Sequence, residues 1–155
     1  MELIPFTKDG LDFFKKELEH LKHVERPEVI TAIANARAHG DLRENAEYHA
    51  ARERQGFIEA RISELEDKLS RAQVIGVPDP KPDNIRFGAW VTLRDEKDHV
   101  KKYRIVGDLE ADIKANKVSL SSPLARALLG KHVGDLVEIQ APGGLKEYEV
   151  VEVDY

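Results

Sequence analysis

Two patterns of apolar residues divide the chain: a helical spacing over roughly the first half and an alternation of period two over the second. Near the N-terminus, apolar side chains recur in steps of three and four: Leu11, Phe14, Leu18 and Leu21. This spacing predicts one face of a helix, for which Thr7 is a candidate N-cap. The stripe continues past Pro27 through Val29, Ile33 and Ala36. We expect one helix kinked near that proline, because no glycine or turn cluster surrounds it; the alternative is two helices separated there.

A second helical run follows a short turn. Its seam positions step alternately by four and three: Ala51, Gln55, Ile58, Ile62, Leu65, Leu69 and Ala72. This is a heptad seam, and a helix over residues 42–72 would be ~45 Å long at 1.5 Å per residue. The link between the two runs is too short for anything but an antiparallel hairpin. Such a coiled coil carries its turn at a distal tip, so the residues of the turn are the first candidates for function.

The helical pattern ends in a stretch with three prolines, residues 76–84. We place a linker there, between a hairpin domain (1–75) and a second domain (85–155). Strands are then expected over 87–93, 101–106, 117–120, 136–140 and 146–153. One short helix is expected between residues 122 and 130. Its cap is Ser122, its first-position proline is Pro123, and Gly130 ends it. Trp90 is assigned to the core. The expected fold class is α+β in two domains, the second a small β-sheet with one short helix.

Composition narrows the class of protein. The 155 residues include no cysteine, which excludes disulfides and thiolate metal sites and is typical of an intracellular, cytoplasmic protein. The first residues lack the basic and apolar blocks of a signal peptide, and no apolar run approaches the ~20 residues of a membrane span. The net charge of -5 argues against a free nucleic-acid binder. The six histidines have no metal-ligand spacing and are expected on the surface.

The turn of the predicted hairpin carries two acids, Asp41 and Glu44. One interpretation is a capping box, because Asp-x-x-Glu at a helix start satisfies backbone N–H groups of the first turn, and the helix dipole favours acids there. The other is chemical: two carboxylates can hold a divalent cation or activate a water. Mg²⁺ prefers about six oxygen ligands, so two acids are too few to hold it tightly. They would instead complete a site whose other ligands a partner protein supplies. The two interpretations are compatible.

The two acids also belong to a longer motif, Gly40-Asp41-Leu42-Arg43-Glu44-Asn45-Ala46-Glu47-Tyr48-His49-Ala50-Ala51. This motif resembles the tip of the GreA/GreB family of bacterial transcript cleavage factors. The resemblance extends along nearly the whole chain. Arg26-Pro27-Glu28 is similar to the family's first helix, which carries a proline there. Residues 122–130 and 142–144 resemble its C-terminal domain, which is FKBP-like in this family.

The resemblance implies a transcription elongation factor that acts on bacterial RNA polymerase and is not an enzyme on its own. The coiled coil would enter the secondary channel of the polymerase, and the C-terminal domain would dock on its rim. Asp41 would help bind the second Mg²⁺ of the polymerase active centre. Glu44 would orient or deprotonate the water that cleaves the 3′ end of the nascent RNA in backtracked complexes. The isolated chain is expected to be a monomer without a resident cofactor.

Further candidate residues come from the same resemblance. Two are expected to shape the tip: Asn45 and Tyr48. Three arginines flank the tip, Arg37, Arg52 and Arg54, and the first two are the preferred candidates for contact with the extruded RNA, because single strands are followed mainly by positive charge. Three residues are candidates for docking on the polymerase: Ser122, Pro123 and Arg126. Each set has an ordinary alternative, namely packing of the tyrosine on the opposing helix, solvated surface arginines, and a capped helix that covers the sheet.

Three other functions remain as alternatives. A regulator that binds the same channel without cleavage would carry a different acidic tip, whereas the tip motif is intact here. A prolyl isomerase would line its pocket with aromatic residues, and the aromatic positions of the second half show little sign of such a cluster. A plain coiled-coil scaffold would explain the hairpin but gives no reason for an acidic turn.

Overall fold

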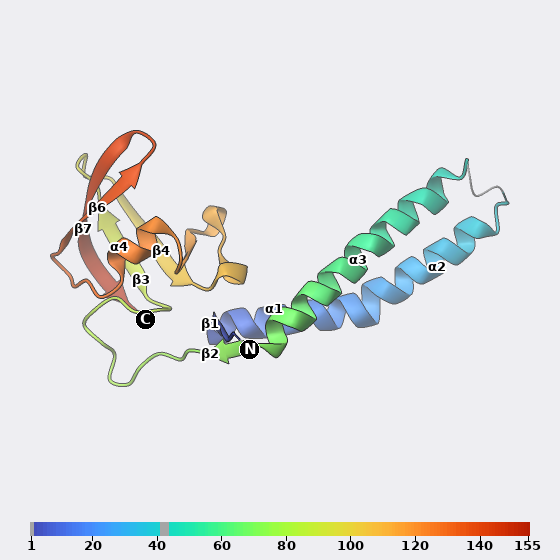
Figure 1. Ribbon diagram of the computed structural model, residues 1–155, viewed down its shortest axis with the longest axis horizontal. Coiled ribbons are helices and arrows are strands. Elements are labelled where there is room, and N and C mark those ends of the chain that lie inside the picture. Colours follow the sequence, from blue (N-terminus) through green and yellow to red (C-terminus); the bar gives the residue numbers. More distant parts are fainter. Residues whose placement is uncertain (1, 41–43) are drawn as a thin grey trace. The chain divides into compact units, whose positions relative to one another are not determined.

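The computed structural model describes residues 2–40 and 44–155 (Figure 1). The chain divides into two compact units, one formed by residues 2–3 and Asp9–Ala72 and the other by Ile4–Lys8 and Gln73–Tyr155. The first unit is a long helical hairpin and the second contains a five-stranded sheet, so the predicted combination of a helical hairpin and a small sheet is confirmed. In the described part of the chain, no helix is long and apolar enough to cross a membrane.

The first arm of the hairpin runs through Pro27 without a break. Helix α1 (Lys8–His20) passes through a π-helical turn, η1 (Leu21–Glu25), into α2 (Arg26–Arg37). The N–H of Arg26 donates to the carbonyl of Leu21, five residues earlier. A π-turn adds one residue to a helical turn, and it lies directly before the region where the proline removes a backbone donor. The irregularity that the proline predicts is therefore this π-turn, and the alternative of two separate helices is wrong.

The second arm is α3 (Ala46–Ser70), which lies beside α2 (Figure 1). The buried residues of the two helices are those of the predicted seam: Val29, Ile33, Ala36, Ala51, Ile58, Ile62 and Leu65. The helix is shorter than predicted, about 38 Å at 1.5 Å per residue. It starts four residues late because Asn45, in extended backbone conformation, caps it. It also ends before Ala72, which opens the short strand β2 (Ala72–Val74).

Ion pairs join the flanks of the hairpin. Four basic residues reach acids on the opposite arm: Arg26 to Glu59, Arg61 to Glu17, Lys22 to Glu66, and Arg54 to Glu25 and Glu28. The Arg61 guanidinium also donates to Glu64 on its own helix, and these bonds, the one to Glu17 first, raise its pKa. Because these side chains are partly exposed, the pairs add modestly to the register that the buried seam sets.

The second unit is built on a five-stranded sheet. Its strands are β3 (Trp90–Arg94), β4 (Val100–Val106), β5 (Lys117–Ser119), β6 (Leu136–Ala141) and β7 (Gly144–Asp154), in the order β5-β4-β3-β7-β6. Neighbours are antiparallel except β4 and β5. Two short 3-10 turns, Asp108–Glu110 and Ile113–Ala115, lie between β4 and β5. The five predicted strands are therefore present, and the first begins three residues late because residues 87 and 88 form a turn.

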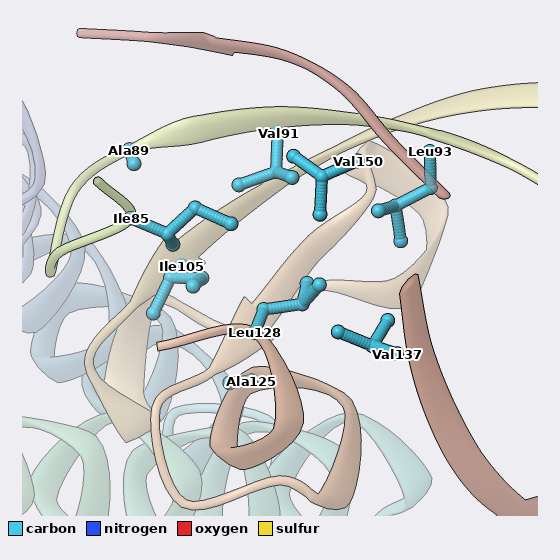
Figure 2. Packing of buried hydrophobic residues seen from close by; sticks show 9 residues of the cluster. All are labelled: Ile85, Ala89, Val91, Leu93, Ile105, Ala125, Leu128, Val137 and Val150. Atoms are coloured by element: carbon cyan, nitrogen blue, oxygen red, sulfur yellow. The ribbon is translucent and has the colours of Figure 1, made fainter. Parts of the chain in front are cut away.

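One short helix, α4 (Pro123–Leu128), covers the core of this unit. Ala125 and Leu128 lie against sheet residues such as Val91 and Val150 (Figure 2). The Ser122 hydroxyl accepts a hydrogen bond from the N–H of Ala125 at 3.2 Å, so Ser122 is the N-cap that the sequence predicts. The helix and its cap are confirmed.

Trp90 does not lie in this core. Its neighbours Ala89 and Val91 are fully buried, and because side chains alternate along a strand, Trp90 points to the other face of the sheet. It is half-buried there, with Lys102 Nζ 5.5 Å and Arg104 Cζ 5.6 Å from the centre of its ring. The core assignment is wrong, and the indole lies close to two cationic side chains on the other face of the sheet.

The N-terminal segment belongs to the second unit, which the sequence pattern does not reveal. Strand β1 (Ile4–Phe6) pairs with β2 in a small two-stranded sheet, and Phe6 is fully buried. Thr7, directly before α1, donates from its N–H to Glu110 Oε2 at 2.9 Å and from its hydroxyl to Oε1 of the same carboxylate. Both side chains are buried. These bonds hold the segment against the η2 turn (Asp108–Glu110), more than a hundred residues away in sequence.

Candidate functional site

The candidate site is the turn between α2 and α3. Asp41, the first of the two predicted carboxylates, lies outside the described residues, as do residues 42 and 43. Glu44 is described: it is exposed and directly precedes the residue that caps α3. The part of the turn that the structure describes thus presents one candidate catalytic carboxylate to solvent.

The residue that caps α3 is Asn45. Its Oδ1 accepts a hydrogen bond from the N–H of Tyr48 at 3.0 Å, the usual link from an N-cap to the third helical position. Its own carbonyl accepts the first intrahelical bond, from His49 N at 3.1 Å. The prediction that Glu44 completes a capping box is therefore wrong, because the first turn begins two residues after it. Its carboxylate is left for a role other than capping.

Asn45 also reaches the other helix. Its Nδ2 donates to the carbonyl oxygen of Ala36 at 2.6 Å, in the last turn of α2. That carbonyl also accepts a hydrogen bond from the N–H of His39 at 3.2 Å, so the carboxamide uses the second lone pair of the oxygen. One carboxamide therefore joins the end of α2 to the start of α3. The sequence identifies Asn45 only as part of the tip motif and gives no sign of this bridge.

Two further contacts cross the turn. The Arg37 guanidinium carbon lies 5.8 Å from the centre of the Tyr48 ring, and Tyr48 is half-buried. His39 Nδ1 lies 3.7 Å from Glu47 Oε2. Between the helices, Gly40 has a φ of +103°, in the region that favours glycine, and its N–H donates to Arg37 O. The structure thus brings Arg37 and Tyr48 together, although the sequence suggested separate roles for them.

The two arginines on α3 near the tip, Arg52 and Arg54, have surroundings that differ from those of Arg37. Arg54 is paired with Glu25 and Glu28 at 3.8 and 3.6 Å. Arg52 is exposed and donates to Gln55 Oε1 at 3.3 Å; within the described residues no carboxylate forms an ion pair with it or with Arg37. As far as the described residues show, the charges of Arg37 and Arg52 are without a carboxylate partner, whereas the charge of Arg54 is compensated by Glu25 and Glu28.

The predicted docking residues lie together around α4. Ser122 caps the helix, and Pro123, exposed, is its first residue. Arg126 is exposed and lines a shallow open groove with Leu129 and Leu136, among others. Leu136 is 62% exposed. This end of the second unit therefore combines an exposed cation with exposed apolar side chains.

The described residues contain no resident metal site. No group of three or more His, Cys, Asp or Glu side chains suited to a metal ion occurs among them. The six histidines are all exposed, as predicted.

The fold and the turn define a class of protein: a coiled-coil hairpin with an acidic turn, followed by a small α+β unit. Two family models together match nearly the whole chain. The model described as "Transcription elongation factor, N-terminal" matches residues 4–74, and the one described as "Transcription elongation factor, GreA/GreB, C-term" matches residues 79–155. The chain belongs to the GreA/GreB family of transcription elongation factors.

Relatives with this family name align over the whole chain. It is 61% identical over 153 residues to transcription elongation factor GreA of Xanthomonas axonopodis pv. citri, with 97% of each chain covered. It is 54% identical over 156 aligned positions to the GreA protein of Phenylobacterium zucineum, covering 100% of this chain and 99% of the relative. Among solved structures, GreA factor homolog 1 of Thermus thermophilus is 29% identical, with a TM-score of 0.45 and coverage of 99% and 100%. The chain is accordingly a transcription elongation factor.

Proposed function

We propose that this elongation factor is a transcript cleavage factor that acts on bacterial RNA polymerase in the cytoplasm. The tip of the hairpin enters the secondary channel and stimulates the polymerase's own Mg²⁺-dependent cleavage of the RNA 3′ end in backtracked complexes. The second unit, FKBP-like in fold, docks on the rim of the channel. The observation that carries the proposal is the placement of Glu44: an exposed carboxylate at the turn of a hairpin, released from capping by Asn45.

The carboxylates of the tip fit a metal site that is completed by another protein. Carboxylate oxygens are ligands that Mg²⁺ prefers, but the ion takes about six oxygens. The described residues offer no cluster of three ligands. Asp41 and Glu44 therefore suit a site whose remaining ligands belong to the polymerase. When bound there, a pair of Mg²⁺ ions stabilises the attacking and leaving oxygens of an in-line displacement.

The chain contributes two acids to this chemistry and is not an enzyme by itself. Asp41 supplies a carboxylate oxygen to the shared Mg²⁺ site. Glu44 accepts a hydrogen bond from the attacking water, orients it, and takes up its proton, for which it must lie within hydrogen-bond reach of the water. The exposure of Glu44 permits that approach, since no packing in the described residues covers it.

The basic residues near the tip bind the RNA, and the second unit binds the polymerase. Arg37 and Arg52 contact phosphates of the extruded RNA, supported by the lack of a carboxylate partner for either among the described residues. Ser122, Pro123 and Arg126 contribute to docking, supported by the exposed cation and leucines around α4. The factor acts as a monomer, because a single hairpin occupies the channel.

The test is cleavage of RNA in backtracked complexes of a polymerase from the same source, with Mg²⁺ present. Wild-type protein is expected to shorten the RNA. Asp41→Asn and Glu44→Gln should bind polymerase normally and lose most of the stimulation. Glu53→Gln is the matched control, because Glu53 is an exposed acid on α3 beyond the tip. If wild-type protein binds and only inhibits, the chain is instead a regulator that does not cleave.

A further inference from the structure

We propose that Asn45 is a positioning residue for Glu44. Its carboxamide bridges the two helices of the tip and so holds the backbone that carries the adjacent catalytic carboxylate. The inference rests on the cleavage function proposed above and names the residue that orders the site.

The bridge consists of two hydrogen bonds made by one side chain. Asn45 Nδ2 lies 2.6 Å from the carbonyl oxygen of Ala36, and Oδ1 lies 3.0 Å from the N–H of Tyr48. The Tyr48 N–H is one of the donors that a helix leaves unsatisfied at its N-terminus. The Ala36 carbonyl accepts the Asn45 bond in addition to one from the N–H of His39 at 3.2 Å. A carboxamide offers a donor and an acceptor on separate atoms, whereas ionised Asp has no donor and Ser has a single oxygen. Among the usual capping residues, only Asn makes both bonds here.

Glu44 depends on such a link because the other described side-chain contacts across the turn are weaker. The two other contacts across the turn, Arg37 with Tyr48 and His39 with Glu47, involve exposed charged groups. Exposed pairs of this kind hold a geometry weakly, because solvent screens them. The Asn45 bond to Ala36 is part-buried and short. It is therefore the strongest described constraint on the backbone next to Glu44.

This constraint matters because a general base works only within hydrogen-bond reach of its water. A displacement of about 1 Å in a reacting group can lower a rate by about 100-fold. Loss of the bridge leaves Glu44 chemically intact but distributes it over more positions. The rate at saturating factor should then fall, while binding of the hairpin to the polymerase should not.

Asn45→Ser separates the bridge from the cap, since Ser caps a helix about as well as Asn but has no second atom to reach Ala36. The control is Asn35→Ser, the same change at an exposed position of α2. RNA cleavage is measured against factor concentration. For Asn45→Ser, we expect the maximal rate to fall by about tenfold or more and the half-saturating concentration to stay unchanged. A wild-type maximal rate, or an effect on the half-saturating concentration alone, would overturn the proposal.

A double-mutant cycle distinguishes positioning from a general structural effect. If Asn45 acts through Glu44, Asn45→Ser should cause no further loss in a Glu44→Gln background, because coupled residues are not additive. Effects that multiply in full would show that Asn45 acts independently, and would overturn the assignment.

The bridge can also be tested without polymerase. Its hydrogen bond should slow exchange of the Asn45 side-chain amide protons with water, relative to those of the exposed Asn35, as measured by NMR. Equal exchange rates would overturn the inference whatever the cleavage assay shows. If wild-type protein does not cleave while the Asn45 amide is protected, the proposed function fails and the bridge stands as a structural feature only.

Discussion

Arg26 and Glu59, on opposite arms of the hairpin, form a bidentate ion pair in which Nε and Nη2 donate to the two carboxylate oxygens at 2.7 and 2.8 Å. The planar guanidinium matches a carboxylate in this geometry, so the pair specifies direction as well as distance. The hydrogen bonds from Arg26 lower the pKa of Glu59 and those to Glu59 raise the pKa of Arg26. The pair lies at the junction of η1 and α2, where the helix changes its repeat.

The first prediction concerns the register of the hairpin. Arg26→Glu places two acids opposite each other and should lower the thermal midpoint of unfolding. Adding Glu59→Arg should restore most of the loss, because the pair is then re-formed with its charges exchanged. Circular dichroism of the single and double variants measures this. An equal loss in Arg26→Glu and the double variant would show that the pair does not contribute to register.

The second prediction is a pH dependence that belongs to Glu59. Its pKa is lowered from the ordinary value of 4.5, so its contribution to stability is fully present above that pH and is lost as the pH falls through the lower, folded-state pKa. Thermal midpoints of wild type and Glu59→Gln, measured from neutral pH to well below 4.5, should therefore converge on acidification. Parallel curves would contradict the assignment. Both side chains are substantially exposed, so added salt should reduce the difference.

The third prediction concerns the attachment of the N-terminal segment. A Cβ on Gly107 would lie 2.2 Å from the carbonyl oxygen of Pro5, a backbone atom that cannot rotate away. Gly107→Ala should therefore destabilise the protein, by about 1–3 kcal/mol as overpacked sites do. Gly143→Ala is the control, since a Cβ there meets no atom within 4 Å and the backbone has no positive φ. Urea denaturation measures both, and equal stabilities would show that the segment moves away from Gly107 without cost.

The fourth prediction concerns the buried carboxylate that holds the same segment. Thr7→Val removes the hydroxyl that donates to Glu110 Oε1 and leaves the backbone bond to Oε2. Because Glu110 is only 7% exposed, the loss should cost about 1–3 kcal/mol in the free energy of unfolding. Thr31→Val, at an exposed position of α2, should change stability little. A wild-type stability for Thr7→Val would mean that water replaces the hydroxyl.

The elements that were predicted well are those encoded locally. The seam residues Ile58, Ile62 and Leu65 are buried because a heptad spacing puts them on one face of any helix that forms. The cap at Ser122 and the proline after it are likewise local, and α4 begins as they predict. The π-turn before Pro27 was foreseen only as an irregularity, because a proline shows where a backbone donor is missing but not how the helix adjusts.

The features that were predicted badly depend on residues far away in the chain or on the opposite face. Trp90 looked like a core residue by type, but the burial of Ala89 and Val91 assigns it to the outer face, under Lys102 and Arg104. Asp-x-x-Glu looked like a capping box by spacing. Helix α3 begins later than this spacing predicts because Asn45 is its N-cap.

The sequence by itself determined the coiled coil, the family motif at its turn and the two acids proposed to act in catalysis, since periodicity and motif spacing are properties of neighbouring residues. Only the tertiary structure decided where α3 starts, that Asn45 reaches back to Ala36, and that Thr7 belongs with Glu110 in the second unit. The physical reason is that a side-chain hydrogen bond to a terminal carbonyl or a buried carboxylate depends on two segments meeting in space, and no local pattern specifies that meeting.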